Sequence, residues 1–288
     1  MQEFNIQISK KYNIPCTYCG DITQTSKVVL HLNSANTNNT IINYFHIPKE
    51  KNYCFVCPNL PGNSFESKYH SLSNNNSYIK IIVKIINKIK EIYPNVKQVY
   101  LSGESWGANL AILFCHKHHN LISGIVCWNA PNWIVQTEDL SKTRESTWSV
   151  GIKHIITLLT NINFKARVGD LSGLTDNKIF ERIYNVALSK RNYINCDVRI
   201  DIAVFKSMFF TYRYLKKHFK KNIQTPLIYI QTKNDAYYCR NIKKLQKIAK
   251  YQKQPNEIIF CENGYHMLTY DMKGNDKVIW DNLDKLTK

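Results

Sequence analysis

The five residues 103–107 constrain the fold of this chain more than any other part of its sequence. They read Gly-Glu-Ser-Trp-Gly, directly after the apolar run at 99–102, which predicts a strand, and directly before a helical pattern at 108–118. Side chains at 103 and 107 would collide with neighbouring elements in so sharp a turn, and Ser105 between them is expected in a strained conformation. The motif therefore predicts a strand, a tight turn and a helix packed in layers.

Strands and helices alternate along most of the chain. In the helix predicted at 77–92, isoleucines recur at helical spacing with lysines opposite, and Pro94 follows its end. Further strands are predicted at 4–9, 17–21, 28–32, 53–57, 124–128, 226–232 and 257–260, and further helices at 41–45, 240–251 and 276–286. This order predicts the α/β fold class, with a mostly parallel sheet between two layers of helices.

The alternation breaks between residues 133 and 222, where helical patches lie at 152–159, 177–188 and 202–218. The strand pattern resumes after this segment. One interrupted domain explains the order better than two domains in tandem. We therefore predict a core formed by 1–132 and 223–288, and a helical cap, or lid, inserted at 133–222.

Three residues after predicted strands carry the chemistry of a nucleophilic site. A serine hydroxyl such as that of Ser105 is a weak nucleophile, so it needs a histidine base that is oriented by an acid. Asp235 and His266 follow the last two predicted strands, in the chain order serine, acid, histidine. The backbone N–H of Trp106, at the start of the following helix, is a candidate donor to an oxyanion.

Over nearly its whole length the chain resembles the α/β-hydrolase fold family. The resemblance rests on the G-x-S-x-G motif, on the loop Pro-Asn-Leu-Pro-Gly-Asn-Ser at 58–64, on the segment ending at Asp235 and on Gly-Tyr-His-Met-Leu at 264–268. Those last residues look most like monoacylglycerol lipases, lysophospholipases and acyl thioesterases. The resemblance implies a mostly parallel eight-stranded sheet, Ser105 as nucleophile, His266 as general base and then acid, Asp235 as its orienter, and no cofactor.

The sequence departs from that family pattern at the second oxyanion donor. The family commonly has His-Gly at the end of its third strand, whereas this chain has His-Leu-Asn-Ser at 31–34. The donor would be the backbone N–H of Asn33 or of Ser34. Trp106 after the nucleophile is also similar to haloalkane dehalogenases, but those have aspartate where this chain has Ser105, so the residue indicates ester or thioester chemistry.

The composition of the predicted cap favours a hydrophobic acyl group as substrate. Its bulky aromatic residues either line an acyl pocket or, as the default explanation, pack the helices: Trp133, Trp148, Phe164, Phe205, Phe209, Phe210, Tyr212 and Tyr214. We therefore expect a serine hydrolase that cleaves a small-molecule acyl ester or thioester through an acyl-enzyme. Two alternatives stay open: an acyltransferase with the same triad, and a noncatalytic ligand-binding protein on the hydrolase scaffold, which the missing His-Gly motivates.

The chain is strongly basic, with 39 Lys and Arg against 21 Asp and Glu and a net charge of +18. Because the lysines are scattered, we expect exposed solvated faces and no nucleic-acid partner. The densest cluster lies at 213–221 and includes His218. It predicts a solvated helix face, with weak association to an anionic membrane surface as the alternative. The sequence leaves the oligomeric state open.

Nine cysteines are present, most of them inside apolar runs, which indicates reduced core thiols. Cys16 and Cys19, with Cys54 and Cys57, have the spacing of a zinc site. However, a strand at 53–57 would direct Cys54 and Cys57 to opposite faces, so we predict no metal and keep zinc as the alternative. Cys115, His116 and His119 are interpreted as part of a basic helix end.

No basic segment followed by an apolar run opens the sequence, and no stretch approaches 18 uninterrupted apolar residues. We therefore expect a soluble, cytoplasmic protein.

Overall fold

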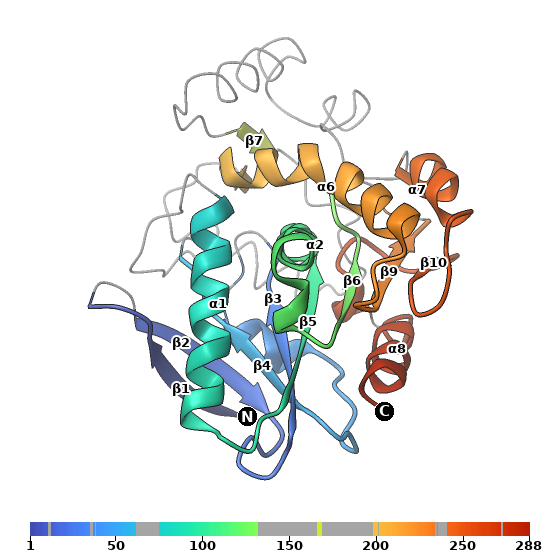
Figure 1. Ribbon diagram of the computed structural model, residues 1–288. Coiled ribbons are helices and arrows are strands. Elements are labelled where there is room, and N and C mark those ends of the chain that lie inside the picture. The colour runs from blue at the N-terminus through green and yellow to red at the C-terminus, as the bar shows by residue number, and fades with distance from the viewer. Residues whose placement is uncertain are drawn as a thin grey trace.

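A mostly parallel sheet of eight strands forms the centre of the protein (Figure 1). The computed structural model describes residues 1–10, 13–34, 37, 39–61, 75–131, 166–168, 198–200, 202–233, 235, 241–271 and 273–288. The strands are β1 (Gln2–Gln7), β2 (Asn13–Cys19), β3 (Lys27–Leu32), β4 (Cys54–Pro58), β5 (Gln98–Glu104), β6 (Gly124–Trp128), β9 (Leu227–Thr232) and β10 (Glu257–Cys261). Their order across the sheet is β1-β2-β4-β3-β5-β6-β9-β10.

Only the N-terminal part of the sheet is antiparallel. β1 pairs with β2 and β2 with β4 in antiparallel register, while every later pair is parallel. Strands β4 and β6 are buried at every residue, as parallel strands covered on both faces must be. The predicted α/β class, with a mostly parallel sheet between two layers of helices, is confirmed.

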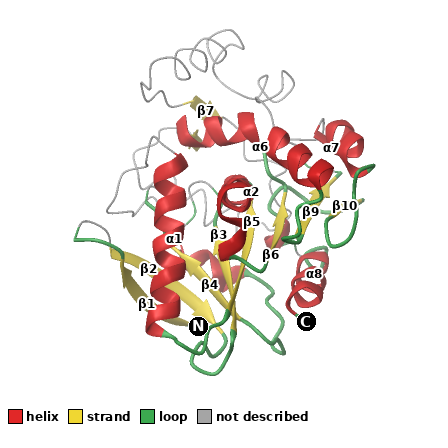
Figure 2. Ribbon diagram, in the orientation of Figure 1, coloured by secondary structure: helices red, strands yellow, loops and turns green. Residues whose placement is uncertain are grey.

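Two layers of helices cover the sheet (Figure 2). Buried residues of α1, α2, α6 and α7 form one core cluster with one face of the sheet, and η1 and α8 contribute to a second cluster on the other face. The helices are α1 (Asn75–Ile92), α2 (Trp106–His118), α6 (Ile202–Lys221), α7 (Asn241–Ala249) and α8 (Lys277–Thr287), with short 3-10 turns η1 (Asn39–Tyr44), η2 (His119–Leu121) and η3 (Leu268–Tyr270).

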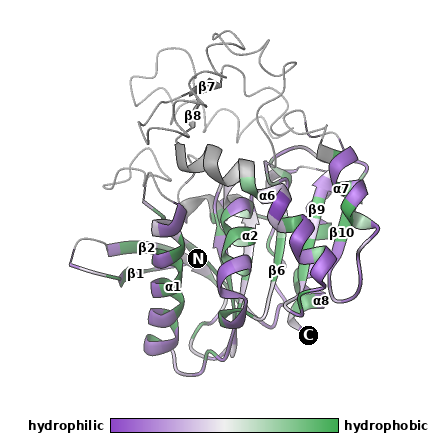
Figure 3. Cartoon of the chain, turned by 45° about the horizontal axis from the view of Figure 1, so that its top comes forward, coloured by the Kyte–Doolittle hydropathy of each residue, from purple (hydrophilic) through white to green (hydrophobic). Residues whose placement is uncertain are grey.

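The helical patterns read from the sequence correspond to these elements. The isoleucines of α1 at 81, 82, 85, 86 and 89 are buried, as the spacing predicts, but Ile92 is exposed because it lies at the very end of the helix. Figure 3 shows the hydrophobic colour concentrated in the strands and on the sides of helices that face them. None of the helices in the described part of the chain combines the length and the apolar character needed to cross a bilayer.

Within 133–222, the structure describes α6 and a separate two-stranded antiparallel sheet of β7 (Ala166–Val168) and β8 (Val198–Ile200). That pair was not predicted by the helical patterns. The helices expected at 152–159 and 177–188 lie outside the described residues. Leu215 and Phe219 of α6 are buried in the core cluster, and Thr211 Oγ1 donates to Asn109 Oδ1 of α2 over 2.8 Å. The helix expected in the cap thus packs on the core at its C-terminal half, while the boundary at 222 stays a prediction.

The cysteines of β4 lie on opposite faces of the sheet, as predicted. Cys54 joins the first core cluster together with Cys16, and Cys57 joins the second. Consequently the two Cys-x-x-Cys pairs do not converge on one point. Among the described residues no group of three or more histidine, cysteine or acidic side chains is arranged to hold a metal ion. Burial raises the pKa of the Cys54 thiol to about 12, which favours the neutral form.

The cluster at 213–221 is mostly a solvated face, as expected. Arg213, Lys216, Lys217, Lys220 and Lys221 are exposed on α6. His218 is the exception and corrects the prediction, because it is buried and its Nε2 bonds Asn256 Oδ1 over 2.8 Å.

The end of β3 lies directly against the first turn of α2. A Cβ placed on Gly107 would overlap the backbone carbonyl of Leu32 and stand 2.6 Å from the carbonyl oxygen of Asn33. A Cβ on Gly103 would stand 2.6 Å from the carbonyl carbon of Gly107. Both obstacles are backbone atoms, so no side-chain movement relieves them.

Gly107→Ala is therefore expected to lower the free energy of unfolding by more than about 3 kcal/mol, because a clash with backbone exceeds ordinary overpacking. Urea denaturation followed by circular dichroism measures the change. Gly274→Ala is the control: its φ is +73° but nothing lies within 4 Å of the added Cβ, so only the backbone cost of about 1 to 2 kcal/mol applies. Equal stability losses in the two variants would contradict the packing described.

Candidate active site

Ser105 occupies a strained turn between β5 and α2. Its φ of 53° and ψ of −120° lie in a region that non-glycine residues seldom adopt. Two backbone bonds hold it there: Ser105 N–H donates to the carbonyl of Trp128 over 3.1 Å, and the Ser105 carbonyl accepts from Asn109 N–H over 3.2 Å. The hydroxyl is consequently fixed at the carboxyl end of the parallel strands, where the sequence analysis placed it.

The structure brings His266 and Asp235 together with that hydroxyl. His266 Nε2 lies 3.0 Å from Ser105 Oγ, and His266 Nδ1 lies 3.0 Å from Asp235 Oδ2. All three residues are buried. Burial by itself lowers the pKa of the imidazole, but the Asp235 carboxylate, with a smaller contribution from Glu104, outweighs it, so the pKa of His266 is raised. Such a chain can take a proton from the serine and stabilise the cation that results.

The predicted oxyanion donors lie around the same turn. Trp106 is the first residue of α2, so its backbone N–H has no acceptor within the helix and belongs to the end that attracts negative charge. Asn33 and Ser34 follow β3, whose end contacts Gly107. The side chain of Asn33 is engaged elsewhere, since its Oδ1 accepts from the Cys57 thiol over 2.9 Å. The backbone of 33–34 thus borders the site, and the choice between its two N–H groups stays a prediction.

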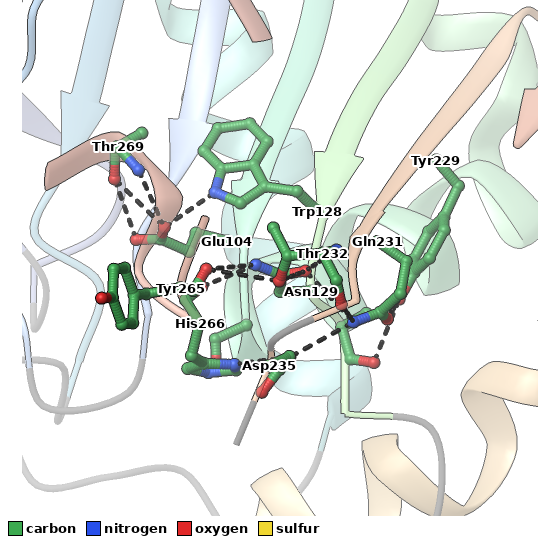
Figure 4. Close-up of polar contacts among 12 residues, drawn as sticks. Glu104, Trp128, Asn129, Tyr229, Gln231, Thr232, Asp235, Tyr265, His266 and Thr269 are labelled. Atoms are coloured by element: carbon green, nitrogen blue, oxygen red, sulfur yellow. Dashed lines mark hydrogen bonds and ion pairs between the residues drawn. The ribbon is translucent and has the colours of Figure 1, made fainter. Parts of the chain in front are cut away.

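Asn129, directly after β6, connects the loops that carry Asp235 and His266 (Figure 4). Its Oδ1 accepts from Thr232 N–H over 2.9 Å, at the end of β9. Its Nδ2 donates to the carbonyls of Tyr265 and His266, over 3.1 and 2.8 Å. One buried amide therefore fixes the separation between the β9 end and the histidine loop. Asn129 adopts a φ of 48°, which asparagine tolerates better than most residues.

Gln231 supports the acid of this group. Its Nε2 lies 3.3 Å from Asp235 Oδ2 and 3.2 Å from Asn129 Oδ1, and its Oε1 accepts from the Tyr229 hydroxyl over 3.1 Å. This donor shares Asp235 Oδ2 with the imidazole of His266 and helps to orient the buried carboxylate.

Glu104, the residue before the nucleophile, is also buried. Trp128 Nε1 donates to its Oε1 over 2.7 Å, and Thr269 Oγ1 lies 3.1 and 3.2 Å from its two oxygens. Burial raises the pKa of the Glu104 carboxyl to about 7, although these hydrogen bonds and the charge of His266 act in the opposite direction.

Four residues of the site were not predicted from the sequence: Glu104, Asn129, Gln231 and Thr269. A signal was available for the first three, because each is a polar residue at or just beyond the carboxyl end of an otherwise apolar strand. Thr269 carried no such signal.

Among the described histidines outside the triad, His31 lies beneath this site. His31 is stacked between Phe55 and Trp128, and its Nδ1 lies 3.0 Å from Ser102 Oγ. Burial lowers the pKa of His31 to about 3, so the ring is neutral at ordinary pH. His116 stacks on Tyr214.

Most of the cap aromatics lie outside the residues whose side chains the structure describes. Of those within them, Tyr212 and Tyr214 pack against the core cluster, which agrees with packing as the default explanation. Lining of an acyl pocket stays a prediction for the others: Trp133, Trp148, Phe164, Phe205, Phe209 and Phe210.

Comparison with known proteins agrees with this fold. The model of a hydrolase family described as serine aminopeptidase, S33, matches residues 62–273, more than half of the chain. The chain therefore belongs to this family of α/β hydrolases, and the resemblance seen in the sequence is confirmed. No curated protein matches its sequence.

Solved structures with the same fold include lipases and a thioesterase, each below 20% identity. A soluble variant of monoglyceride lipase from Saccharomyces cerevisiae, in complex with a substrate analog, is similar with a TM-score of 0.71 and 12% identity over 99% of this chain and 93% of that one. The monoacylglycerol lipase of Paleococcus ferrophilus gives 0.65 and 14%, covering 99% and 98%. The thioesterase domain from the curacin biosynthetic pathway gives 0.58 and 16%, covering 98% and 99%.

Asn129→Ala is expected to lower the free energy of unfolding by about 2 to 4 kcal/mol, because it leaves buried groups of two loops without partners. Urea denaturation measures the loss. The control is Asn282→Ala in α8, which removes one bond from Nδ2 to the Val278 carbonyl and is expected to cost about 1 kcal/mol. If both variants lose the same stability, Asn129 does not connect the loops as described.

Proposed function

We propose that this protein is a serine hydrolase that cleaves a carboxylic ester or thioester with a hydrophobic acyl chain. The observation that carries the proposal is the continuous chain of contacts from Ser105 Oγ through the His266 imidazole to Asp235, each 3.0 Å long, at a strained turn before a helix. A hydroxyl so placed is set to attack a carbonyl, and the helix end favours the negative charge that develops.

The reaction has two steps, acylation of Ser105 and hydrolysis of the acyl-enzyme. Ser105 Oγ bonds to the carbonyl carbon and its proton passes to His266 Nε2, while backbone N–H groups of Trp106 and of Asn33 or Ser34 stabilise the oxyanion. The bond to the leaving alcohol or thiol breaks as that group takes the proton from His266. Water then attacks the acyl-enzyme, its proton passes through His266 to Ser105, and the free acid leaves. Asp235 stabilises the imidazolium in both steps.

The proposed acyl group rests on the composition of segment 133–222 and on desolvation. Burying an acyl chain yields about 0.8 kcal/mol for each methylene, so an aromatic cover discriminates by chain length. We also propose a cytoplasmic location and weak association of the exposed α6 cations with anionic lipid, both from the sequence.

The test is turnover of a chain-length panel of p-nitrophenyl esters and acyl thioesters. We expect kcat/KM to rise with chain length, and Ser105→Ala to reduce it more than about a thousandfold because the nucleophile is lost. Ser102→Ala is the matched control: it removes a buried serine hydroxyl of β5 that bonds His31 and not the triad, and should retain turnover. Full turnover by the Ser105 variant would refute the assignment.

Product analysis separates hydrolysis from its two rivals. Free acid in the presence of an added alcohol or thiol acceptor supports hydrolysis, whereas acyl transfer to the acceptor identifies an acyltransferase. A protein that binds the substrates without turning any of them over would be a ligand receptor on the hydrolase scaffold.

A further inference from the structure

Glu104 is an acid placed close to the reacting groups without belonging to the proposed triad. It ends β5, immediately before Ser105, and its register partner in the parallel pairing with β6 is Trp128. That pairing brings the indole N–H within 2.7 Å of its Oε1. The carboxyl group is buried, and no lysine or arginine neutralises it among the contacts found for the described residues. Burying an acid without a cationic partner costs folding free energy, so the presence of this carboxyl group needs an explanation.

The other side of the carboxyl group faces the loop that carries the histidine. Thr269 lies three residues after His266, in η3, and its hydroxyl is 3.1 and 3.2 Å from the two carboxyl oxygens. The Thr269 backbone N–H is 3.5 Å from Oε1. Figure 4 shows Glu104 joined on one side to Trp128 and on the other to Thr269. The loop after the histidine is thereby tied to the strand that carries the nucleophile.

The groups around Glu104 determine which charges its carboxyl group meets. Among the described residues, His266 is the ionisable side chain that interacts with the charge of Glu104, and the influence is mutual, since each favours the charged form of the other. From β6, Trp128 contributes only a neutral donor. From β3, His31 stacks on that indole and is held neutral by burial. Asp235, in the loop after β9, binds the Nδ1 atom of the same imidazole.

We propose that Glu104 is a second acidic positioning residue, whose carboxylate holds the histidine loop through Thr269 and supplies negative charge that stabilises the imidazolium of His266 during the reaction. The inference rests on the proposed function, because it assumes that His266 is the base. The fully active form then has His266 neutral and Glu104 ionised. Because burial brings the pKa of Glu104 to about 7, this second acid titrates in the range in which the base works.

The test is the pH dependence of kcat/KM with one ester that the wild-type protein hydrolyses. Glu104→Gln keeps the size of the side chain and an acceptor for the indole but removes the charge. The pKa of His266 should fall without its partner, moving the acid limb of the profile about one pH unit lower, and the plateau of kcat/KM should fall about tenfold because the imidazolium is less stabilised.

Thr269→Val changes the same profile in the opposite direction. It removes a hydroxyl that stabilises the carboxylate, so the pKa of Glu104 rises and the acid limb moves to higher pH. Thr17→Val is the matched control, since Thr17 of β2 is equally buried but its hydroxyl accepts from Asn39 Nδ2 of η1, away from the site. The control should leave the midpoint unchanged. A merely structural role would lower the melting temperature without moving either midpoint.

The outcomes separate this inference from the proposed function. Opposite shifts in the two variants support the role of Glu104. An active wild type whose acid limb stays in place in Glu104→Gln overturns it and leaves the proposed function standing. If Glu104→Gln does not fold, the test rests on Thr269→Val. A shift of the acid limb of its kcat/KM profile to higher pH supports the inference, and an unchanged midpoint of that limb overturns it. A wild type inactive toward every substrate removes the proposed function, and the inference falls with it.

Discussion

The close approach of β3, β5 and the first turn of α2 is the constraint on which the rest of the site depends. Gly103 and Gly107 leave no room for side chains, because backbone atoms occupy the space where each Cβ would stand. That contact forces the chain to reverse within a few residues, and Ser105 takes up the strain with a positive φ. The same contact brings the backbone after β3 beside the start of α2, where an anion is stabilised.

Parallel strands then deliver the remaining groups to one edge. β5 ends in Glu104, Asn129 follows β6, and Asp235 follows β9, so polar side chains from three adjacent strands meet below His266. Because these groups are buried, each unsatisfied one would be costly, and the hydrogen bonds of Asn129 remove that cost while fixing the loops. Stability and positioning of the site therefore come from the same bonds.

Much of this arrangement could be predicted from residue order alone. Ser105, Asp235 and His266 each follow an apolar run, and parallel strands share one carboxyl edge, so their proximity required no knowledge of side-chain contacts. The partners of Glu104 could not be predicted, since they depend on β6 lying next to β5 and on a turn 165 residues further along the chain. His218 was misread because helical spacing shows which residues share a face but not that α6 turns this side chain toward Asn256. The pair β7 and β8, three residues each, is too short for alternation to be detected.

The central claim is that the hydroxyl of residue 105 is activated by the imidazole of residue 266. Mapping the covalent adduct of a fluorophosphonate probe tests it most directly, because such probes phosphonylate an activated serine and the digested protein reveals which one by mass spectrometry. We predict one modified peptide, with the adduct on Ser105, and a much slower reaction in His266→Ala. An adduct on another serine, or labelling at Ser105 that proceeds equally fast without the imidazole, would contradict the account.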